Sequence, residues 1–388
     1  MSEADFVGLD VSVFQSVIDV GDVDARVALT RQLVALVADP ATARIEIEQV
    51  GPVLLRLAGD DEKAVRLVLA QEFASSSRID AQLAFSIIAD DDDIALPFLA
   101  QTKALSAAQI TVIAKVGDEA RQTTIVSRSD VPPEACELVI GQGSAVACVA
   151  LLQNTAIMLE DMDFHVLYKR FGNNTDIVER LLAKPAIPAE IRITQARRTA
   201  ARMRQMMAER GWIAANDASD LCADAEDNAV MQVLVESDEV GRSKALAFMA
   251  AKKLLTPAFV VRSAALGQMV VVEASLAHLT GFTPSRTAQQ MYHRHPASFK
   301  ALFKRSGLPM SCFGMLRAAC DVVIDTREEG LEISSSEFGG RVLEALMTRY
   351  EAMSPQERAK QIEYLGRYGE DKIRKVAKRL RADLVRAA

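Results

Sequence analysis

Five short segments in the first 200 residues resemble one another, and this repetition limits the possible folds more than any other feature. Each segment begins with Asp, Asn or Ser and reaches a pair of apolar residues about seven or eight positions later. The second residues of these pairs are Leu69, Leu99, Val126, Leu152 and Leu182, so the intervals between them are 30, 27, 26 and 30 residues. Self-similarity at a nearly fixed period is the signature of repeat architectures.

Each unit of the repeat predicts a pair of short helices. Asp, Asn and Ser are favourable N-caps, because their oxygen atoms accept hydrogen bonds from N–H groups of the first turn. Apolar residues then recur at helical spacing, and a second apolar segment follows a short polar link. These second segments span 81–89, 106–117, 132–143 and 162–172. Pro133 suits the first turn of such a helix, and Gly117 and Gly143 suit its end.

The helix pairs predict a stacked architecture, because a single pair cannot bury its apolar face whereas stacked pairs share a continuous core. We therefore expect residues 1–212 to form a compact, curved α-solenoid of short helical hairpins. Its last helix begins near Ala189 and is rich in arginine, and residues 213–223 are small and acidic, as is typical of a boundary. Residues 213–388 are predicted to form a C-terminal helical domain that ends in a basic helix, so the fold class is all-α.

Composition supports helices and limits the possible partners. Aromatic residues make up only 5% of the chain, and Ala, Leu, Val and Ile dominate the apolar half, which suits closely packed helices better than sheets. The net charge of −7 argues against nucleic-acid binding by the chain as a whole. The charge is uneven, however, because residues 355–388 hold ten Lys or Arg against five Asp or Glu. This segment therefore carries +5 and the remainder −12.

Cysteine usage and the missing targeting signals indicate the cytoplasm. The five cysteines include no C-x-x-C pair, and their odd number in a long chain favours reduced thiols over a disulfide framework. The N-terminus is acidic and lacks the basic region and the long apolar core of a signal peptide. No run of about 18 apolar residues is uninterrupted, so we expect no membrane span.

The capped units resemble a known family when they are taken together with residues 279–323, LTGFTPSRTAQQMYHRHPASFKALFKRSGLPMSCFGMLRAACDVV. The chain is similar over residues 20–330 to the uncharacterised bacterial proteins known as domain of unknown function 2336. This resemblance implies a helical fold with HEAT-like repeats. It implies no activity and no catalytic residues, so only the fold is carried over.

The sequence contains no recognisable catalytic or cofactor motif. It has no G-x-S-x-G, P-loop or G-x-G-x-x-G pattern. His293 and His295 are two residues apart, on different faces of a helix, and lack the spacing of a zinc site. The acidic run Asp90–Asp93 lacks the EF-hand pattern and is interpreted as a turn with an N-cap. We therefore expect neither a cofactor nor a metal site, and no enzyme activity.

Two basic segments are the candidate partner-binding sites. The first is the helix after Ala189, and the second is the terminal helix, in which Ile373, Val376, Ala377, Leu380 and Leu384 form an apolar stripe. The candidate residues are Arg192, Arg197, Arg198, Arg202, Arg204, Lys372, Lys375, Lys378 and Arg379. Such helices bind nucleic acid, anionic lipid or an acidic protein, or they are packed helices with a solvated charged face.

Three hypotheses for the function follow from these observations. The leading one is a cytoplasmic, non-enzymatic scaffold or regulatory adaptor that binds another protein, because solenoids present extended concave surfaces. The alternative is a HEAT-like nucleic-acid-binding protein that uses the basic helix 192–210 and the basic tail, an analogy at the level of the fold. The third is an enzyme of unfamiliar type. The sequence leaves the oligomeric state open, and a peripheral membrane contact through the tail is a further possibility.

Overall fold

Every regular element that the computed structural model describes is a helix. The described residues are 11–76, 78–212 and 214–330, together with 338, 340–342, 344 and 345. The predicted all-α fold class is therefore confirmed. The chain divides into two compact units, Met1–Ile187 (unit 1) and Pro188–Ala388 (unit 2).

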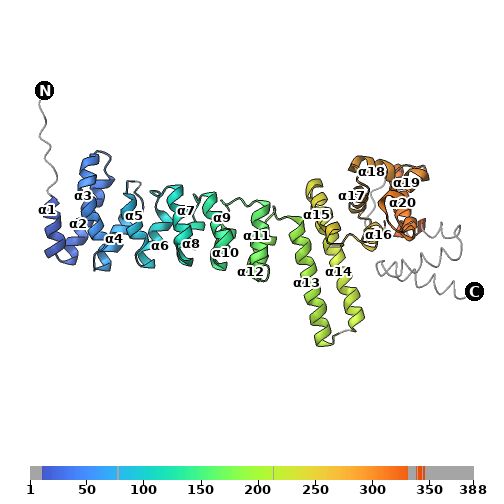
Figure 1. Cartoon of the computed structure of the whole chain (residues 1–388), viewed down its shortest axis with the longest axis horizontal. Helices are drawn as coiled ribbons and strands as arrows, with labels where there is room; N and C mark the ends of the chain where they lie inside the picture. The colour runs from blue at the N-terminus through green and yellow to red at the C-terminus, as the bar shows by residue number, and fades with distance from the viewer. Residues whose placement is uncertain are drawn as a thin grey trace, which may run out of the picture. The chain divides into compact units, whose positions relative to one another are not determined.

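Unit 1 consists of short helices that follow one another closely (Figure 1). They are α1 (Val11–Val20), α2 (Val23–Ala38), α3 (Arg44–Ala58), α4 (Lys63–Phe73), α5 (Ala81–Ile88), α6 (Asp92–Gln101), α7 (Ala107–Val116), α8 (Glu119–Val126), α9 (Pro133–Gln142), α10 (Ala145–Gln153), α11 (Asp161–Phe171) and α12 (Thr175–Leu182).

The predicted capping residues begin several of these helices. Asp118, Ser144 and Asn174 are the N-caps of α8, α10 and α12, and each side chain accepts a hydrogen bond from the backbone N–H three residues later. Gly117 and Gly143 end α7 and α9, but both have extended rather than left-handed backbone. Glycine is favoured there because an added Cβ would lie 2.6 Å from Ile113 O and 2.7 Å from Val139 O, respectively.

Helices of unit 1 pack mainly against near neighbours in the chain. The even-numbered helices from α2 to α12 contact one another in order, and most odd-numbered helices do the same. Their facing sides form a core in which Leu69, Leu99, Val126 and Leu152 of the repeated apolar pairs are buried. In the last pair Leu181 is buried instead of Leu182. The period of the sequence thus corresponds to the spacing of the even-numbered helices.

Three guanidinium groups, of which that of Arg128 is buried, connect helices that are not adjacent in the chain. Arg121 donates to Ile88 O at 2.9 Å and to Asp90 O at 2.8 Å, at the end of α5. Arg128 is 6% exposed and donates to Leu99 O and, at 2.7 Å, to Thr102 O at the end of α6. Arg170 donates to Ile140 O and, at 2.6 Å, to Gly143 O at the end of α9. We call Arg121, Arg128 and Arg170 the arginine clamps.

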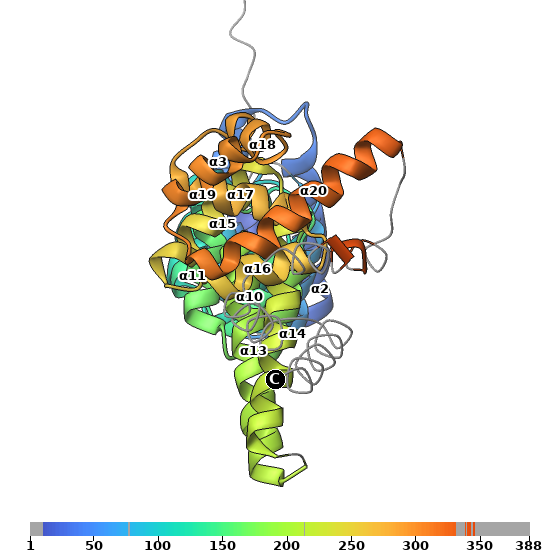
Figure 2. The same ribbon diagram turned by 90° about the vertical axis from the view of Figure 1, so that its right-hand side faces the viewer.

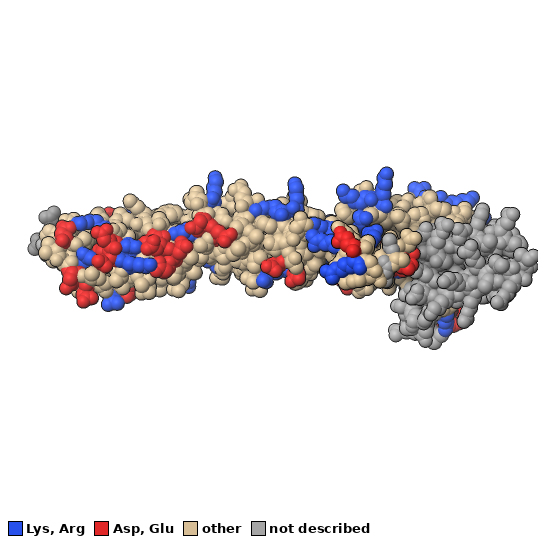
Figure 3. Space-filling view, turned by 90° about the horizontal axis from the view of Figure 1, so that it is seen from below, with Lys and Arg blue, Asp and Glu red and all other residues tan. Residues whose placement is uncertain are grey.

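Ion pairs add to these connections at the N-terminal ends of the even-numbered helices. Arg66 of α4 lies 2.8 Å from Asp90, and both side chains are largely buried. Arg121 of α8 lies 3.0 Å from Asp92 of α6. Acidic side chains outnumber basic ones on this face of unit 1 (Figure 3). The acidic run therefore provides helix starts and ion-pair partners, as predicted for the turn.

Unit 2 contains longer and more varied helices. They are α13 (Ala189–Arg210), α14 (Ala215–Glu236), α15 (Glu239–Ala251), α16 (Pro257–Ala265), α17 (Met269–Thr280), α18 (Pro284–Met291), α19 (Pro296–Ser306), the short 3-10 helix η1 (Met310–Cys312) and α20 (Phe313–Glu329). Thr256 and Thr283 are N-caps that precede Pro257 and Pro284, as expected for helix starts. The helix α16 is central, because every residue from Phe259 to Ala265 is buried.

The division between the units differs from the predicted boundary at 212/213. It lies before α13, because α13 packs against α14 as an antiparallel hairpin and both belong to unit 2. Residues 214–223 are the start of this hairpin's second helix rather than a linker. Small residues allow the close contact, since Ala218 and Cys222 of α14 are buried. In Figure 2 the hairpin extends beyond the other helices of unit 2.

We expect Arg128→Leu to destabilise unit 1 by about 2–4 kcal/mol, because it leaves the buried carbonyls of Leu99 and Thr102 without their donor. Chemical denaturation of the full chain would measure the free energy of unfolding. The matched control is Arg31→Leu, since Arg31 is 61% exposed and lies 3.6 Å from Glu72. The control should change stability by less than about 0.5 kcal/mol. Equal effects of the two substitutions would contradict a stabilising role for the clamp.

Candidate functional site

The arginines predicted as a partner-binding site all lie on α13, but several already have acidic partners. Arg192 pairs with Glu236, and Arg197 donates to Glu226 at 2.8 Å, so these two join α13 to α14. Arg198 and Arg202 also make interactions within the protein. Arg204 is half-buried. The remaining candidates, Lys372, Lys375, Lys378 and Arg379, lie outside the described residues.

A buried charge cluster lies further along α14. Arg262 of α16 is 6% exposed, and its guanidinium pairs with Asp224 and lies 3.8 Å from Asp227. Burial raises the pKa of Asp227 to about 6, although the positive charge of Arg262 opposes the shift. The cluster fixes α16 against α14 and carries one carboxylate that is costly to ionise.

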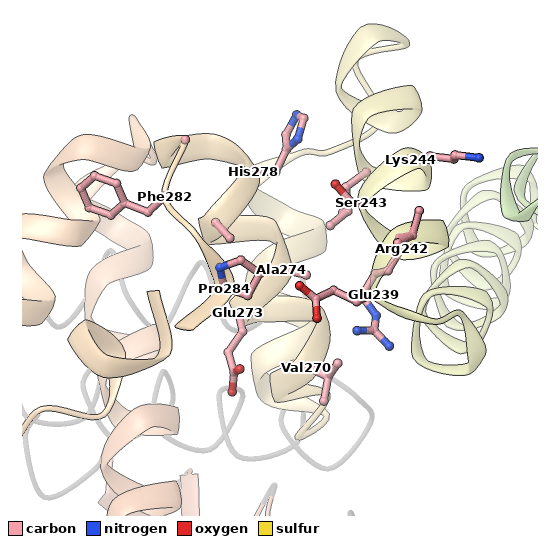
Figure 4. A pocket seen from close by; sticks show the side chains of 14 residues that line it. Glu239, Arg242, Ser243, Lys244, Val270, Glu273, Ala274, His278, Phe282 and Pro284 are labelled. Carbon is pink, nitrogen blue, oxygen red and sulfur yellow. The ribbon is translucent and has the colours of Figure 1, made fainter. Parts of the chain in front are cut away.

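A groove that the sequence analysis did not identify lies between α15, α17 and α18. Its volume is about 740 Å³ (Figure 4). Its walls are largely apolar, and they include Val240, Leu246, Val270, Ala274 and Ala277. Val240 is 63% exposed and Val270 is 47% exposed, so two large apolar side chains face solvent at this groove. The volume falls within the range of ligand sites, roughly 300–1,000 Å³.

Two polar residues at the groove, Arg242 and Glu273, make hydrogen bonds that stabilise the fold. Arg242 donates to Leu234 O at 2.7 Å and to Ser237 O at 2.6 Å, and so caps the end of α14. Glu273 accepts a hydrogen bond from the hydroxyl of Tyr292. Burial and this hydrogen bond raise the pKa of Tyr292. These residues therefore shape the walls of the groove.

No nucleophile–base pair is assembled in the described part of the groove. Ser243 and His278 are exposed and lie towards the same end in Figure 4, but no hydrogen bond joins them. The geometry offers an apolar surface with scattered charges and no arranged catalytic group.

Metal-ligating side chains are dispersed and the thiols are buried in the described part of the chain. Within the described ranges, no group of three or more His, Cys, Asp or Glu side chains is arranged to hold a metal ion. All five cysteine side chains are buried, and burial raises the pKa of Cys136 to about 11. Burial also raises the pKa of Cys148, so neither of these two thiols has the character of a reactive thiolate. No helix among the described residues combines the length and the apolar character that a membrane span needs.

Sequence reasoning missed the groove because its walls come from helices that are distant in the chain. Val240 and Val270 are separated by 30 residues, and nothing in either segment indicates that the two lie near each other. In the sequence, an exposed valine on an amphipathic helix looks the same as a buried one. Only the packing of the helices shows that these two valines are exposed. The basic helix, in contrast, was found from its arginines alone.

Comparison with protein families gives a match to the family described as "Uncharacterised protein conserved in bacteria (DUF2336)". The match covers residues 94–356, which is more than half of the chain, and the chain belongs to this family. It confirms the predicted resemblance. Comparisons with curated proteins and with solved structures gave no match.

We expect Asp227→Asn to stabilise the protein at pH 8 and to have little effect near pH 4. The folded state keeps this proton up to about pH 6, whereas the unfolded chain loses it near the ordinary carboxyl pKa of 3.8. The wild type therefore loses stability as the pH rises through this window. The gain should be about 1 kcal/mol rather than the ~3 kcal/mol that a rise in pKa from 3.8 to about 6 corresponds to, because the side chain is 36% exposed and screened by solvent.

Denaturation curves of wild type and variant at both pH values would measure this difference. Asp224→Asn is the control, because Asp224 is the hydrogen-bonded partner of Arg262 and its replacement should destabilise at pH 8. A variant of Asp227 that is less stable than the wild type at pH 8 would show that the ionised carboxylate is favourable.

Proposed function

We propose that this member of the DUF2336 family is a non-enzymatic scaffold or adaptor in the cytoplasm, and that its groove between α15, α17 and α18 binds an amphipathic helix of a partner protein. The observation that carries the proposal is the open, apolar groove of about 740 Å³ with exposed Val240 and Val270. Amphipathic helices commonly bind by placing an apolar face into such a groove.

Both long walls of the groove are helices, which supports a helical ligand. The residues Val270, Ala274, Ala277 and His278 lie at the i, i+4, i+7 and i+8 positions of α17, so they form one continuous face along the groove. Small side chains at Ala274 and Ala277 leave room for large side chains of a ligand. We expect the partner helix to present Leu, Met or Phe at the corresponding spacing.

Charges at the groove favour one direction of the bound helix. Glu239 and Glu273 lie nearer to Val270, together with the single positive charge of Arg242, so this end is net negative (Figure 4). His278 lies towards the other end. A helix carries partial positive charge at its N-terminus and partial negative charge at its C-terminus. The N-terminus of the partner helix is therefore expected near Glu239 and Glu273.

We further propose that the helices of unit 1 form a HEAT-like α-solenoid. The support is the ordered contact of even-numbered helices with one another and the recurrence of the apolar pairs every 26 to 30 residues. Repeat arrays of this kind hold partners on extended surfaces. Unit 1 would then supply a second surface of the scaffold.

The alternative, nucleic-acid binding through α13, has less support. Arg192 and Arg197 are engaged by Glu236 and Glu226, and a phosphate would have to compete with these carboxylates. The charge of the chain also opposes it. Peripheral membrane contact through the basic tail would use residues outside the described ones.

We expect Val270→Glu to abolish partner binding, because it places a charge on the apolar wall of the groove. A photoactivatable amino acid at Val240 would crosslink the bound partner in living cells, and the crosslinked peptide would be identified by mass spectrometry. The control, Val116→Glu, lies at the end of α7 in unit 1, where Val116 is 76% exposed. It should leave crosslinking unchanged.

Two outcomes would argue against the groove. Crosslinking that persists in a folded Val270→Glu variant would place the partner elsewhere. Nucleic acid that copurifies at low salt, and is lost when Arg198 and Arg202 are both changed to Gln, would support the alternative, since phosphate contacts weaken steeply as salt rises.

A further inference from the structure

The distal end of the α13–α14 hairpin exposes an unusual concentration of large apolar side chains. We define the tip as residues 199–212 and 214–223. Met203 is 42% exposed, Met206 39%, Trp212 58% and Leu221 54%. The contact between the two helices at this end rests on small side chains, since the buried residues are Ala200, Ala218 and Cys222. The tip thus has little core of its own and a large apolar surface, a combination that marks an interaction site.

Met203 and Leu221 lie on the same flank of the hairpin. Arg197 precedes the buried Ala200 by three residues, and Met203 follows it by three. At 100° per residue, the two side chains therefore lie on opposite sides of Ala200 around α13. On α14, Glu226 follows the buried Cys222 by four residues, whereas Leu221 precedes it by one and lies on the other side. Because Arg197 and Glu226 pair at 2.8 Å, they mark one flank, and the apolar side chains share the other.

Met206 and Trp212 extend this apolar flank towards the turn. Met206 lies three residues after Met203, on the same face of α13. Trp212 lies in the turn, where the guanidinium of Arg210 is 5.3 Å from its ring. We call Met203, Met206, Trp212 and Leu221 the apolar strip.

The apolar strip has charges of opposite sign on its two sides. Within the tip, α13 carries Arg202, Arg204 and Arg210 against the single acid Glu209, whereas α14 carries only the acids Asp217 and Asp220. A surface that is basic along one edge and acidic along the other is complementary to a copy of itself after a two-fold rotation. This self-complementarity distinguishes a second copy from a partner of uniform charge.

We propose that the tip binds the tip of a second copy of this chain, flank against flank, to form a four-helix bundle around the apolar strips. With the two-fold axis along the hairpin, α13 of each copy lies antiparallel to α14 of the other, so that Arg210 faces Asp217. A two-fold axis across the hairpin would place α13 against α13 and bring arginines together. The charges therefore select the first arrangement, and bundles of this kind pack through the apolar faces of their helices.

Sedimentation velocity of the full chain, at concentrations from about 1 to 100 µM, would test the proposal, because this range covers micromolar dissociation constants. The wild type should be a dimer at the upper end. Met206→Glu should raise the dissociation constant at least about tenfold, while the melting temperature of the dilute, monomeric protein stays unchanged. The control Ala201→Glu adds the same charge to the same helix at an exposed position off the apolar flank, and it should leave the dimer intact.

Charge reversal separates this interface from other modes of association. Arg210→Glu and Asp217→Arg should each weaken the dimer, and the double variant should restore it, because both cross-copy pairs are then re-formed with reversed sign. A wild type that remains monomeric at about 100 µM would overturn the proposal. A dimer that is insensitive to Met206→Glu would overturn it as well. Val270→Glu in the groove should not affect the dimer, so failure of the proposed groove and failure of the proposed dimer are distinguishable.

Discussion

The capping of helix ends by the arginine clamps is the interaction on which the packing of unit 1 depends. A helix leaves its last carbonyls without intrahelical donors, and a buried end needs another source of hydrogen bonds. Arg121, Arg128 and Arg170 provide it, each from a different helix or link than the one it caps. The same group therefore satisfies backbone acceptors and fixes the distance between neighbouring helices. Short helices with small apolar faces can be stacked because these ends are satisfied.

The same principle reappears in unit 2 in modified form. Arg242 caps the end of α14, and Arg305 donates to Thr280 O at the end of α17. Arg262 instead satisfies carboxylates of α14, which brings the electrostatic cost of a half-buried Asp227. The groove lies next to the end of α14 that Arg242 caps. Arg242 therefore orients α15 and also shapes the wall of the candidate site.

The sequence predicted the features that depend on local chemistry. Asp118, Ser144 and Asn174 were expected as N-caps and are N-caps, because a cap is decided by three or four consecutive residues. The all-α fold and the family were likewise predictable. The division of the chain was not, because α14 begins with Ala and Asp residues that suit a linker and a close-packed helix equally. Only the contact with α13 distinguishes the two.

The candidate sites were likewise predictable only where they depend on residues that are close together in the sequence. The arginines of α13 were visible in the sequence, but their glutamate partners on α14 were not, since Arg192 and Glu236 are 44 residues apart. The groove depends on three helices whose order in the chain gives no sign of their proximity. The clamps were also missed, because an arginine that caps a distant helix has the same local pattern as an arginine on a solvated face.

Near-neighbour packing in unit 1 has a consequence for how such chains diverge. A helix there contacts the next helix and the one after it, and each clamp reaches an end formed two or three helices earlier. Gain or loss of a single helix would exchange the positions of the even-numbered and odd-numbered helices, and it would separate every later clamp arginine from the carbonyl groups that it binds. Gain or loss of a complete helix pair preserves the alternation of the helices and the contacts of the clamps. Natural variation in the length of unit 1 should therefore occur in whole helix pairs, with the arginine-bearing residues transferred as part of each pair.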